Sequence, residues 1–161
     1  MEKRKTDIKK YWADKEAVLG EKLVYKSIAE VKTAVRNSKF GILYLMENNL
    51  YLEYSESGRK TLLDLFTVKP KTDKDNKTIV IPREEIINCY LVPIHKIRKI
   101  FNTDLKETAK LRNLLSTLTM NTLQKLIYGT ALCVLHSRGV LIVQTPSNRE
   151  WFKMLSSESI S

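Results

Sequence analysis

The sequence has few of the residues that build metal and catalytic centres. Its 161 residues include only two cysteines and two histidines. Cys89 and Cys133 have neither the spacing of metal ligands nor the density of a disulfide scaffold. His95 and His136 have no Glu or Cys partner at the spacing that metal ligands require. The sequence therefore predicts no metal site and no cofactor.

Glycine is also scarce, and its five residues are scattered through the chain. Neither a Gly-x-Gly-x-x-Gly motif nor a Gly-Lys-Ser/Thr loop occurs, so the sequence has no glycine-rich cradle for phosphate. The acidic residues Glu84 and Glu85 are adjacent, and neighbours on a strand point to opposite faces of the sheet. Such a pair cannot act together on one bond. We therefore expect a protein that is not an enzyme and has no catalytic residues.

Long apolar segments are missing as well. No run of about 18 apolar residues occurs, which is the length that a membrane-spanning helix needs. The charged residues 1–10 do not have the pattern of a secretory signal. Both cysteines lie in apolar runs, where a thiol behaves as a small buried hydrophobe. The sequence predicts a cytoplasmic protein, with peripheral placement at the inner membrane surface as the alternative.

Positive charge, in contrast, is in excess. Lysine and arginine together number 28 against 18 acidic residues, which gives a net charge of +10. This balance attracts partners that carry negative charge, such as anionic lipid, nucleic acid or acidic protein segments. The alternative is a lysine-rich surface that has no specific partner.

Alternating apolar residues and turn residues predict one β-rich domain over 21–157, after a charged tail or short helix at 1–20. The clearest part is a pair of hairpins between residues 22 and 57. Pro82 should lie at an edge or a bulge, because it cannot donate to a sheet ladder. Strands are predicted at 23–35, 40–46, 50–54, 61–69, 78–92 with a bend at 82–84, 131–136 and 140–145.

The spacing of leucines predicts a helix over residues 104–128. Asp104 and Glu107 have the spacing of a capping box, and Gly129 is placed to end the helix. Its apolar face consists of Leu111, Leu114, Leu115 and Leu118. This face either packs on the sheet or offers a surface for a homo-oligomer.

A second helix is predicted at the end of the chain. Ser147 and Glu150 have the spacing of another capping box. Trp151 lies on the apolar side, and a buried indole contributes a large apolar area. This helix is expected to cover the open end of a curled sheet.

Four segments together resemble the pleckstrin-homology superfold, in its bacterial and GRAM-like branches: residues 41–45, 49–52, 81–86 and 140–155. The resemblance implies a mainly β (α+β) fold, a barrel of about seven antiparallel strands capped by the C-terminal helix. The helix over 104–128 departs from the common pattern and would be an insertion before the last hairpin.

Turn parity in an antiparallel meander places the first and third turns on one rim of the sheet. The resemblance adds the last hairpin turn to the same rim, where such domains commonly bind phosphoinositide headgroups. It therefore implies a cluster that binds an anionic headgroup or an acidic partner. Its predicted members are Arg36, Lys39, Arg59, Lys60 and Arg138. The second strand lacks the alternating Lys and Arg of lipid-binding members.

We therefore predict a non-enzymatic binding or scaffolding module that recruits a protein partner or an anionic membrane surface. The alternative is a nucleic-acid-binding protein, in which Tyr44, Tyr51 and Tyr54 would stack on bases unless they belong to the core. In the tail, Tyr11 and Trp12 either contact a membrane interface or lie in a solvated segment.

Overall fold

The computed structural model describes residues 2–55, 76–104, 107–119 and 129–156. The predicted strand at 61–69 lies outside the described residues. The elements in chain order are α1 (Glu2–Leu19), β1 (Leu23–Lys32), β2 (Ser38–Met46), β3 (Asn49–Ser55), β4 (Asn76–Pro82), the 3₁₀ turn η2 (Arg83–Glu85), β5 (Ile86–Pro93), the 3₁₀ turn η3 (Ile94–Lys96), α3 (Ile97–Phe101), α4 (Thr108–Leu118), β6 (Thr130–His136), β7 (Gly139–Gln144) and α6 (Asn148–Ser156).

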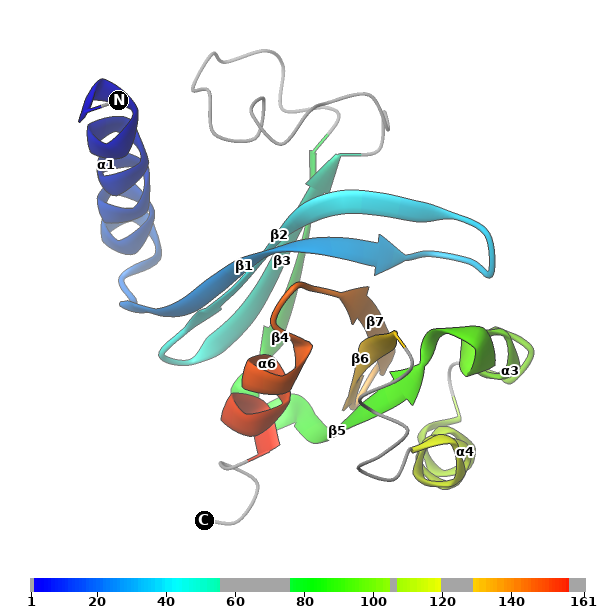
Figure 1. Cartoon of the computed structure of the whole chain (residues 1–161). Helices are drawn as coiled ribbons and strands as arrows, with labels where there is room; N and C mark the ends of the chain where they lie inside the picture. Colours follow the sequence, from blue (N-terminus) through cyan, green and yellow to red (C-terminus); the bar gives the residue numbers. More distant parts are fainter. Residues whose placement is uncertain (1, 56–75, 105–106, 120–128, 157–161) are drawn as a thin grey trace.

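The seven strands form one antiparallel sheet in the order β4-β3-β2-β1-β7-β6-β5, so the prediction of a mainly β fold with antiparallel strands is confirmed (Figure 1). The prediction of a closed barrel is wrong, because β4 and β5 both remain at edges of the sheet. The turn η2 follows Pro82, which has no N–H for a ladder, and it leads the chain away from β4 before β5 begins. Pro82 lies on an edge strand, as predicted.

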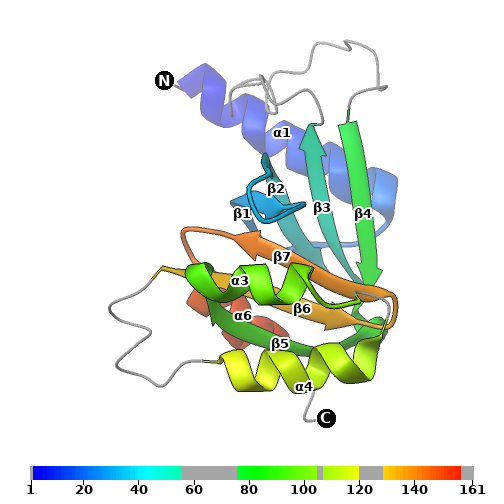
Figure 2. The same cartoon turned by 90° about the vertical axis from the view of Figure 1, so that its right-hand side faces the viewer.

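The sheet consists of two halves that cross steeply (Figure 2). One half contains β1 to β4 and the other contains β5 to β7. They are joined where β1 meets β7, and this pairing covers only Glu30 with Gln144 and Val31 with Val143. So short a ladder cannot hold the two halves together by itself. Apolar packing between the halves must supply the remaining stabilisation.

Three apolar clusters fill the spaces between the layers. The first lies between the inner faces of the two halves and includes Leu43, Leu132 and Trp151. The second lies on the other face of β5 to β7, where α3 and α4 cover it. The third lies on the outer face of β2 and β3, beneath α1. The strands β5 to β7 are therefore covered on both faces, which explains why residues 131–135 are apolar and all buried.

The two cysteines belong to different clusters. Cys89 lies in the cluster between the halves, and Cys133 lies in the cluster under α4. Both thiols are free, and burial raises the pKa of the Cys89 thiol to about 12. Both cysteines therefore serve as small apolar side chains of the core.

The C-terminal helix α6 packs as predicted, with Trp151 as its anchor. The Trp151 side chain is fully buried, and its ring meets Tyr25 of β1 edge to face at 4.9 Å. Its Nε1–H donates to the Ser27 hydroxyl at 2.7 Å. Because α6 also packs against β5, this one side chain connects the two halves of the sheet.

The described part of the helix predicted over residues 104–128 is α4, and residues 105–106 and 120–128 of that prediction lie outside the described residues. The helix α4 begins after Glu107, whose backbone is not helical and whose side chain makes no capping bond, so a cap at Asp104 is wrong. It ends at Leu118. The reason is the serine and threonine content of its last turn, where hydroxyls of Ser116 and Thr117 donate to carbonyls three residues back. Such bonds compete with the helix backbone.

The leucine face of α4 packs on the sheet. Leu111, Leu115 and Leu118 are buried in the second cluster, and Leu114 is partly buried at its margin. These leucines are therefore core residues in the folded chain, and a homo-oligomer through α4 would have to use its polar side.

Gly41 lets β2 and β3 approach closely. A Cβ at this position would lie 2.2 Å from the Glu53 carbonyl oxygen and 2.9 Å from the Tyr54 Cβ. Both are far inside the normal contact distance, and the first is a backbone atom of the paired strand. Only glycine fits at this position without displacing β3.

We predict that Gly41→Ala lowers the free energy of unfolding by about 2–3 kcal/mol, because the new methyl group overpacks the ladder between β2 and β3. Urea denaturation monitored by circular dichroism measures this loss. Gly20→Ala is the matched control: Gly20 has a φ of 68°, but a methyl group added there would have no atom within 4 Å. Its loss should be about 1 kcal/mol, from backbone strain alone. Equal losses for the two variants would contradict the steric explanation.

Candidate functional site

The hairpin between β1 and β2 extends away from the body of the sheet (Figure 1). It carries exposed apolar side chains. Val35 in its turn is 47% exposed, and Phe40 on the outer face of β2 is 58% exposed. Arg36 lies between them in the sequence and is also exposed. We call Val35, Arg36 and Phe40 the hairpin surface. Exposed valine and phenylalanine beside arginine are the features of a contact surface.

The charges around the hairpin surface are mainly positive. Lys32, Arg36 and Lys39 oppose a single acid, Glu30, so residues 30–40 carry a net charge of +2. Glu30 is partly neutralised, because Lys32 Nζ lies 2.5 Å from its carboxylate. The Lys39 ammonium lies over the Tyr54 ring at 5.7 Å from the centroid, on the face opposite to Phe40.

The predicted basic cluster is only partly assembled. Arg36 and Lys39 share the hairpin, whereas Arg59 and Lys60 lie outside the described residues. Arg138 does not join them: its guanidinium donates to the Val80 carbonyl at 3.0 Å, near the C-terminal end of β4. The hairpin turn lies at the level of the N-terminal end of β4, because β2 and β4 both run antiparallel to β3. The β6–β7 turn thus sits at the opposite rim, and its predicted approach to the hairpin is wrong.

Arg138 instead closes the corner between β4 and β5. Its Nε–H donates to the Glu85 carboxylate at 3.1 Å, and the Ser137 hydroxyl donates to the same oxygen at 2.7 Å. The Ser137 N–H donates to the Glu85 carbonyl at 3.1 Å. The hydrogen bond from Ser137, followed by the charge of Arg138, lowers the pKa of Glu85 even though partial burial raises it. These contacts assign Arg138 a structural role.

The outer face of β2 and β3 is covered by α1, so the amino-terminal segment is a docked helix. Trp12 is 5% exposed and meets Tyr44 edge to face at 5.2 Å. Tyr44 in turn stacks on Tyr51 at 5.0 Å with nearly parallel rings. Neither a solvated tail nor membrane contact through Trp12 agrees with this burial. Of the tyrosines that would stack on nucleic-acid bases, Tyr44 and Tyr51 are buried beneath α1, and Tyr54 is partly buried on the other face of the sheet.

A polar network lines the contact between α1 and the sheet. The Glu53 carboxylate accepts hydrogen bonds from the Tyr44 hydroxyl at 2.6 Å and from the Tyr11 hydroxyl at 3.4 Å, and it forms an ion pair with Lys15. Burial, together with Glu53, raises the pKa of both phenols well above the usual range. The Lys26 ammonium lies 4.2 Å above the Trp12 ring. This network fixes α1 and offers no free group for catalysis.

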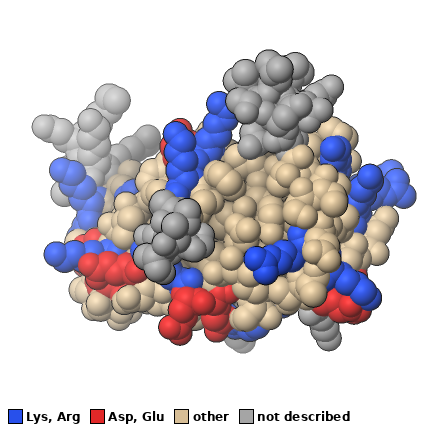
Figure 3. All heavy atoms as spheres, turned by 90° about the horizontal axis from the view of Figure 1, so that it is seen from below, with Lys and Arg blue, Asp and Glu red and all other residues tan. Residues whose placement is uncertain are grey.

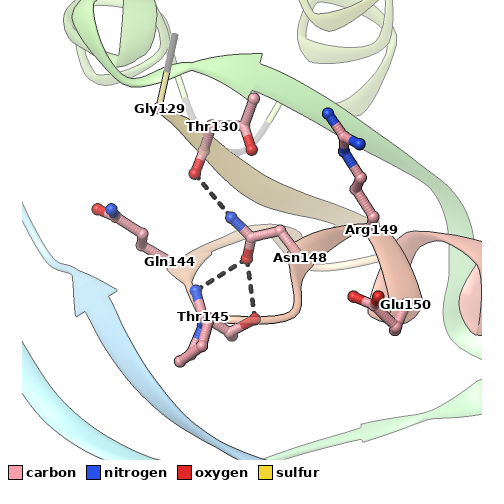
Figure 4. A pocket seen from close by; sticks show the side chains of 8 residues that line it. Gly129, Thr130, Gln144, Thr145, Asn148, Arg149 and Glu150 are labelled. Carbon is pink, nitrogen blue, oxygen red and sulfur yellow. Dashed lines mark hydrogen bonds between the residues drawn. The ribbon is translucent and has the colours of Figure 1, made fainter. Parts of the chain in front are cut away.

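A polar hollow of about 350 Å³ lies where α6 begins. Asn148 is buried at its floor: the side-chain oxygen accepts from the Thr145 N–H at 2.8 Å, and the side-chain nitrogen donates to the Thr130 carbonyl at 2.7 Å (Figure 4). The Arg149 and Glu150 side chains extend in different directions. Because the bonds of Asn148 join β6 to the start of α6, the hollow is a structural corner, and its charged groups do not converge.

The part of the chain that the structure describes has neither a metal centre nor a membrane-spanning helix. Within it, no group of three or more His, Cys, Asp and Glu side chains is placed to hold a metal ion, and no helix is long and apolar enough to cross a membrane. On the face seen from below, Lys and Arg side chains are dispersed among acids and neutral areas (Figure 3). The net charge of the chain is therefore not concentrated on that face.

Val35 and Phe40 were not predicted as site residues. In the sequence, Val35 ends the first predicted strand and Phe40 begins the second. Both are ordinary features of core hairpins, and only the position of α1, which stops short of Phe40, leaves this residue uncovered.

We predict that Ser137→Ala raises the pKa of Glu85 toward its usual value, because the Ser137 hydroxyl makes the largest contribution to lowering it. A carbon-detected NMR titration of the Glu85 carboxyl measures the change. The lowered pKa means that ionised Glu85 stabilises the fold above the usual pKa of about 4.3, and that this contribution is lost as the pH falls through the folded pKa. Ser147→Ala, a substitution in another turn, should leave Glu85 unchanged; a shift in both variants would argue against the local bond.

We also predict that Trp12→Ala releases α1 and lowers stability by about 3 kcal/mol, through the loss of a buried indole. Amide hydrogen exchange should show α1 losing protection while β6 keeps it. Trp12→Phe should cost less, because it retains an aromatic ring and removes an Nε1–H that has no hydrogen-bond partner among the described residues. Full protection of α1 in Trp12→Ala would show that other contacts hold the helix.

Comparisons with known proteins do not assign the chain to a family: no family model matches the sequence, and no curated protein matches it at a significant level.

Proposed function

We propose that the protein is a non-catalytic binding module that docks on an anionic membrane surface through its hairpin surface. The observation that carries the proposal is the exposure of Phe40 and Val35 on a projecting hairpin beside Arg36. Apolar side chains of this kind enter the boundary between headgroups and acyl chains, and neighbouring cations meet the lipid phosphates.

Two features of the hairpin support a surface contact rather than a headgroup pocket. The outer face of β2 presents Phe40, Ile42 and Tyr44, without the cations that would line a specific phosphate site. Lys39 is held on the inner side by the Tyr54 ring. The module would therefore respond to the density of anionic lipid and not to one phosphoinositide.

Nucleic acid, the alternative considered from the net charge, has less support. A sheet that binds single strands exposes its aromatic residues, whereas Tyr44 and Tyr51 are 1% and 6% exposed. No described surface combines exposed aromatic residues with cations as the hairpin surface does. Membrane docking is thus the function that the geometry supports best.

Co-sedimentation with liposomes of increasing phosphatidylserine content tests the proposal. Binding should rise with anionic lipid and fall with salt, because the charge contribution is screened. Arg36→Gln should weaken binding about fivefold, since one surface cation contributes about 1 kcal/mol. Phe40→Ser should weaken it as well, without loss of stability, because the side chain is largely exposed. Arg138→Gln is the matched control and should bind like the parent protein.

A Phe40→Trp variant provides an independent readout. Trp12 and Trp151 are both buried, so a blue shift of fluorescence on adding vesicles would report the new indole at the hairpin. Indifference to phosphatidylserine, or equal losses for the Arg36 and Arg138 variants, would refute docking through the hairpin surface.

A further inference from the structure

Half of β1 has an open edge. This strand pairs with β2 from Leu23 to Lys32, but it meets β7 only at Glu30 and Val31. Continuing the register of β7 would place Pro146 opposite Ile28, and proline has no N–H to donate. The chain turns there into α6. Among the described residues, no strand pairs with the second side of residues 23–29.

The hydrogen-bond pattern between β1 and β2 shows which backbone groups point to this open edge. The Thr33 N–H donates to the Asn37 carbonyl at 3.0 Å, and bonded residues alternate along an antiparallel pair. Lys26, Ile28 and Glu30 therefore direct N–H and C=O away from β2, and Glu30 uses that side to meet β7. The backbone N–H and C=O groups of Lys26 and Ile28 point to the side of β1 on which no described strand lies.

The other two edges of the sheet are protected. On β4 the Val80 carbonyl is occupied by the Arg138 guanidinium, and Pro82 ends the strand. On β5, the helices α4 and α6 pack against the strand, and Pro93 ends it. Natural sheets protect their edges in such ways to prevent pairing with other chains. The open half of β1 has no such protection among the described residues.

Both sides of this edge are suited to a strand. On the outer side, Lys26 is exposed and Ile28 is 39% exposed. On the inner side, Tyr25 and Ser27 contact Trp151, so α6 forms a floor below the edge. In Figure 1 the left part of β1 lies above α6. An added strand would form hydrogen bonds with β1, and every second side chain of that strand would point toward α6.

The charge at the edge selects the partner. Lys22 and Lys26 are exposed, and the Lys26 ammonium also lies over the Trp12 ring. The nearby carboxylates accept backbone hydrogen bonds: Glu16 from the Leu23 N–H at 2.8 Å, and Glu21 from the Asn48 N–H at 2.8 Å. A second copy of β1 paired about Lys26 would place two lysines opposite each other, which is unfavourable. A strand with an acid opposite Lys26 and an aliphatic residue opposite Ile28 is complementary.

We propose that the open edge of β1 binds an extended acidic segment of a protein partner by β-strand addition. Main-chain hydrogen bonds to Lys26 and Ile28 would provide the pairing, and the acid opposite Lys26 would provide the selectivity. This site is separate from the hairpin surface, so the module would join a membrane to a protein.

The test uses a capped synthetic peptide, Ser-Val-Glu-Thr-Ile-Val-Glu-Ser, whose glutamates and isoleucine share one face of a strand. Amide exchange on the parent protein should show new protection at Lys26 and Ile28 when the peptide is added. A control peptide with both glutamates replaced by lysine should bind at least about fivefold more weakly. Lys26→Glu should reverse this preference and bind the lysine peptide better.

The Arg36→Gln variant, which tests membrane docking, should bind the peptide unchanged, so the two proposals can fail independently. Lack of binding at millimolar peptide, or protection at β4 or β5 instead, would overturn strand addition at β1. Doubling of the mass in light scattering, with Lys26 and Ile28 protected before peptide is added, would assign the edge to a second copy and overturn the acidic partner. Because the parent protein carries the main readout, a variant that fails to fold does not decide the outcome.

Discussion

The buried indole of Trp151 is the contact on which the arrangement of the molecule depends. The two halves of the sheet share a ladder of only two residue pairs, between β1 and β7. Trp151 fills the space beside this ladder, touches Tyr25 with its ring and donates its N–H to Ser27. A buried indole combines a large apolar area with one donor that must find a partner, and here both requirements are met by β1. The contacts of Trp151 with β1 therefore fix both the direction of α6 and the way in which the two halves of the sheet cross.

This arrangement also decides which surfaces remain open. The β7 strand leaves β1 at Gln144, because Thr145 and Asn148 start α6 at that point with a closed set of side-chain hydrogen bonds. The first half of β1 therefore keeps an unpaired edge. On the outer face, α1 covers Tyr44 and Tyr51 through Trp12, but its cover does not extend to Phe40. Two accessible regions result, one cationic and apolar at the hairpin and one of strand character at the edge.

Much of the fold could be predicted from the sequence because local patterns coincide with long-range contacts. The strand around Gly41 is a continuous apolar run, the strand around Tyr51 alternates aromatic and aliphatic residues, and the turn between them is short. The terminal helix has its apolar side at Trp151 and Leu155, which are buried in the cluster between the halves. The end of α4 at Leu118 was not predictable from its leucines, since it follows a turn in which the hydroxyls of Ser116 and Thr117 bond to backbone carbonyls.

The candidate site was less predictable, for a physical reason. Arg36 and Arg138 are both turn cations, and nothing local distinguishes a cation that faces solvent from one that bonds to Glu85 and Val80. That difference depends on which rim each turn reaches, and the rim depends on how the halves cross. The resemblance to the pleckstrin-homology superfold remains a prediction.

By itself, the sequence determined the antiparallel strands, the helix that closes the chain and the excess of positive charge, because propensity, spacing and composition act within short segments. Only the tertiary structure decided that the sheet stays open, that Trp12 is buried while Phe40 is exposed, and that Arg138 belongs to a corner. Each of these depends on contacts between residues far apart in the chain. Such contacts form, and stabilise the fold, only when the layers assemble.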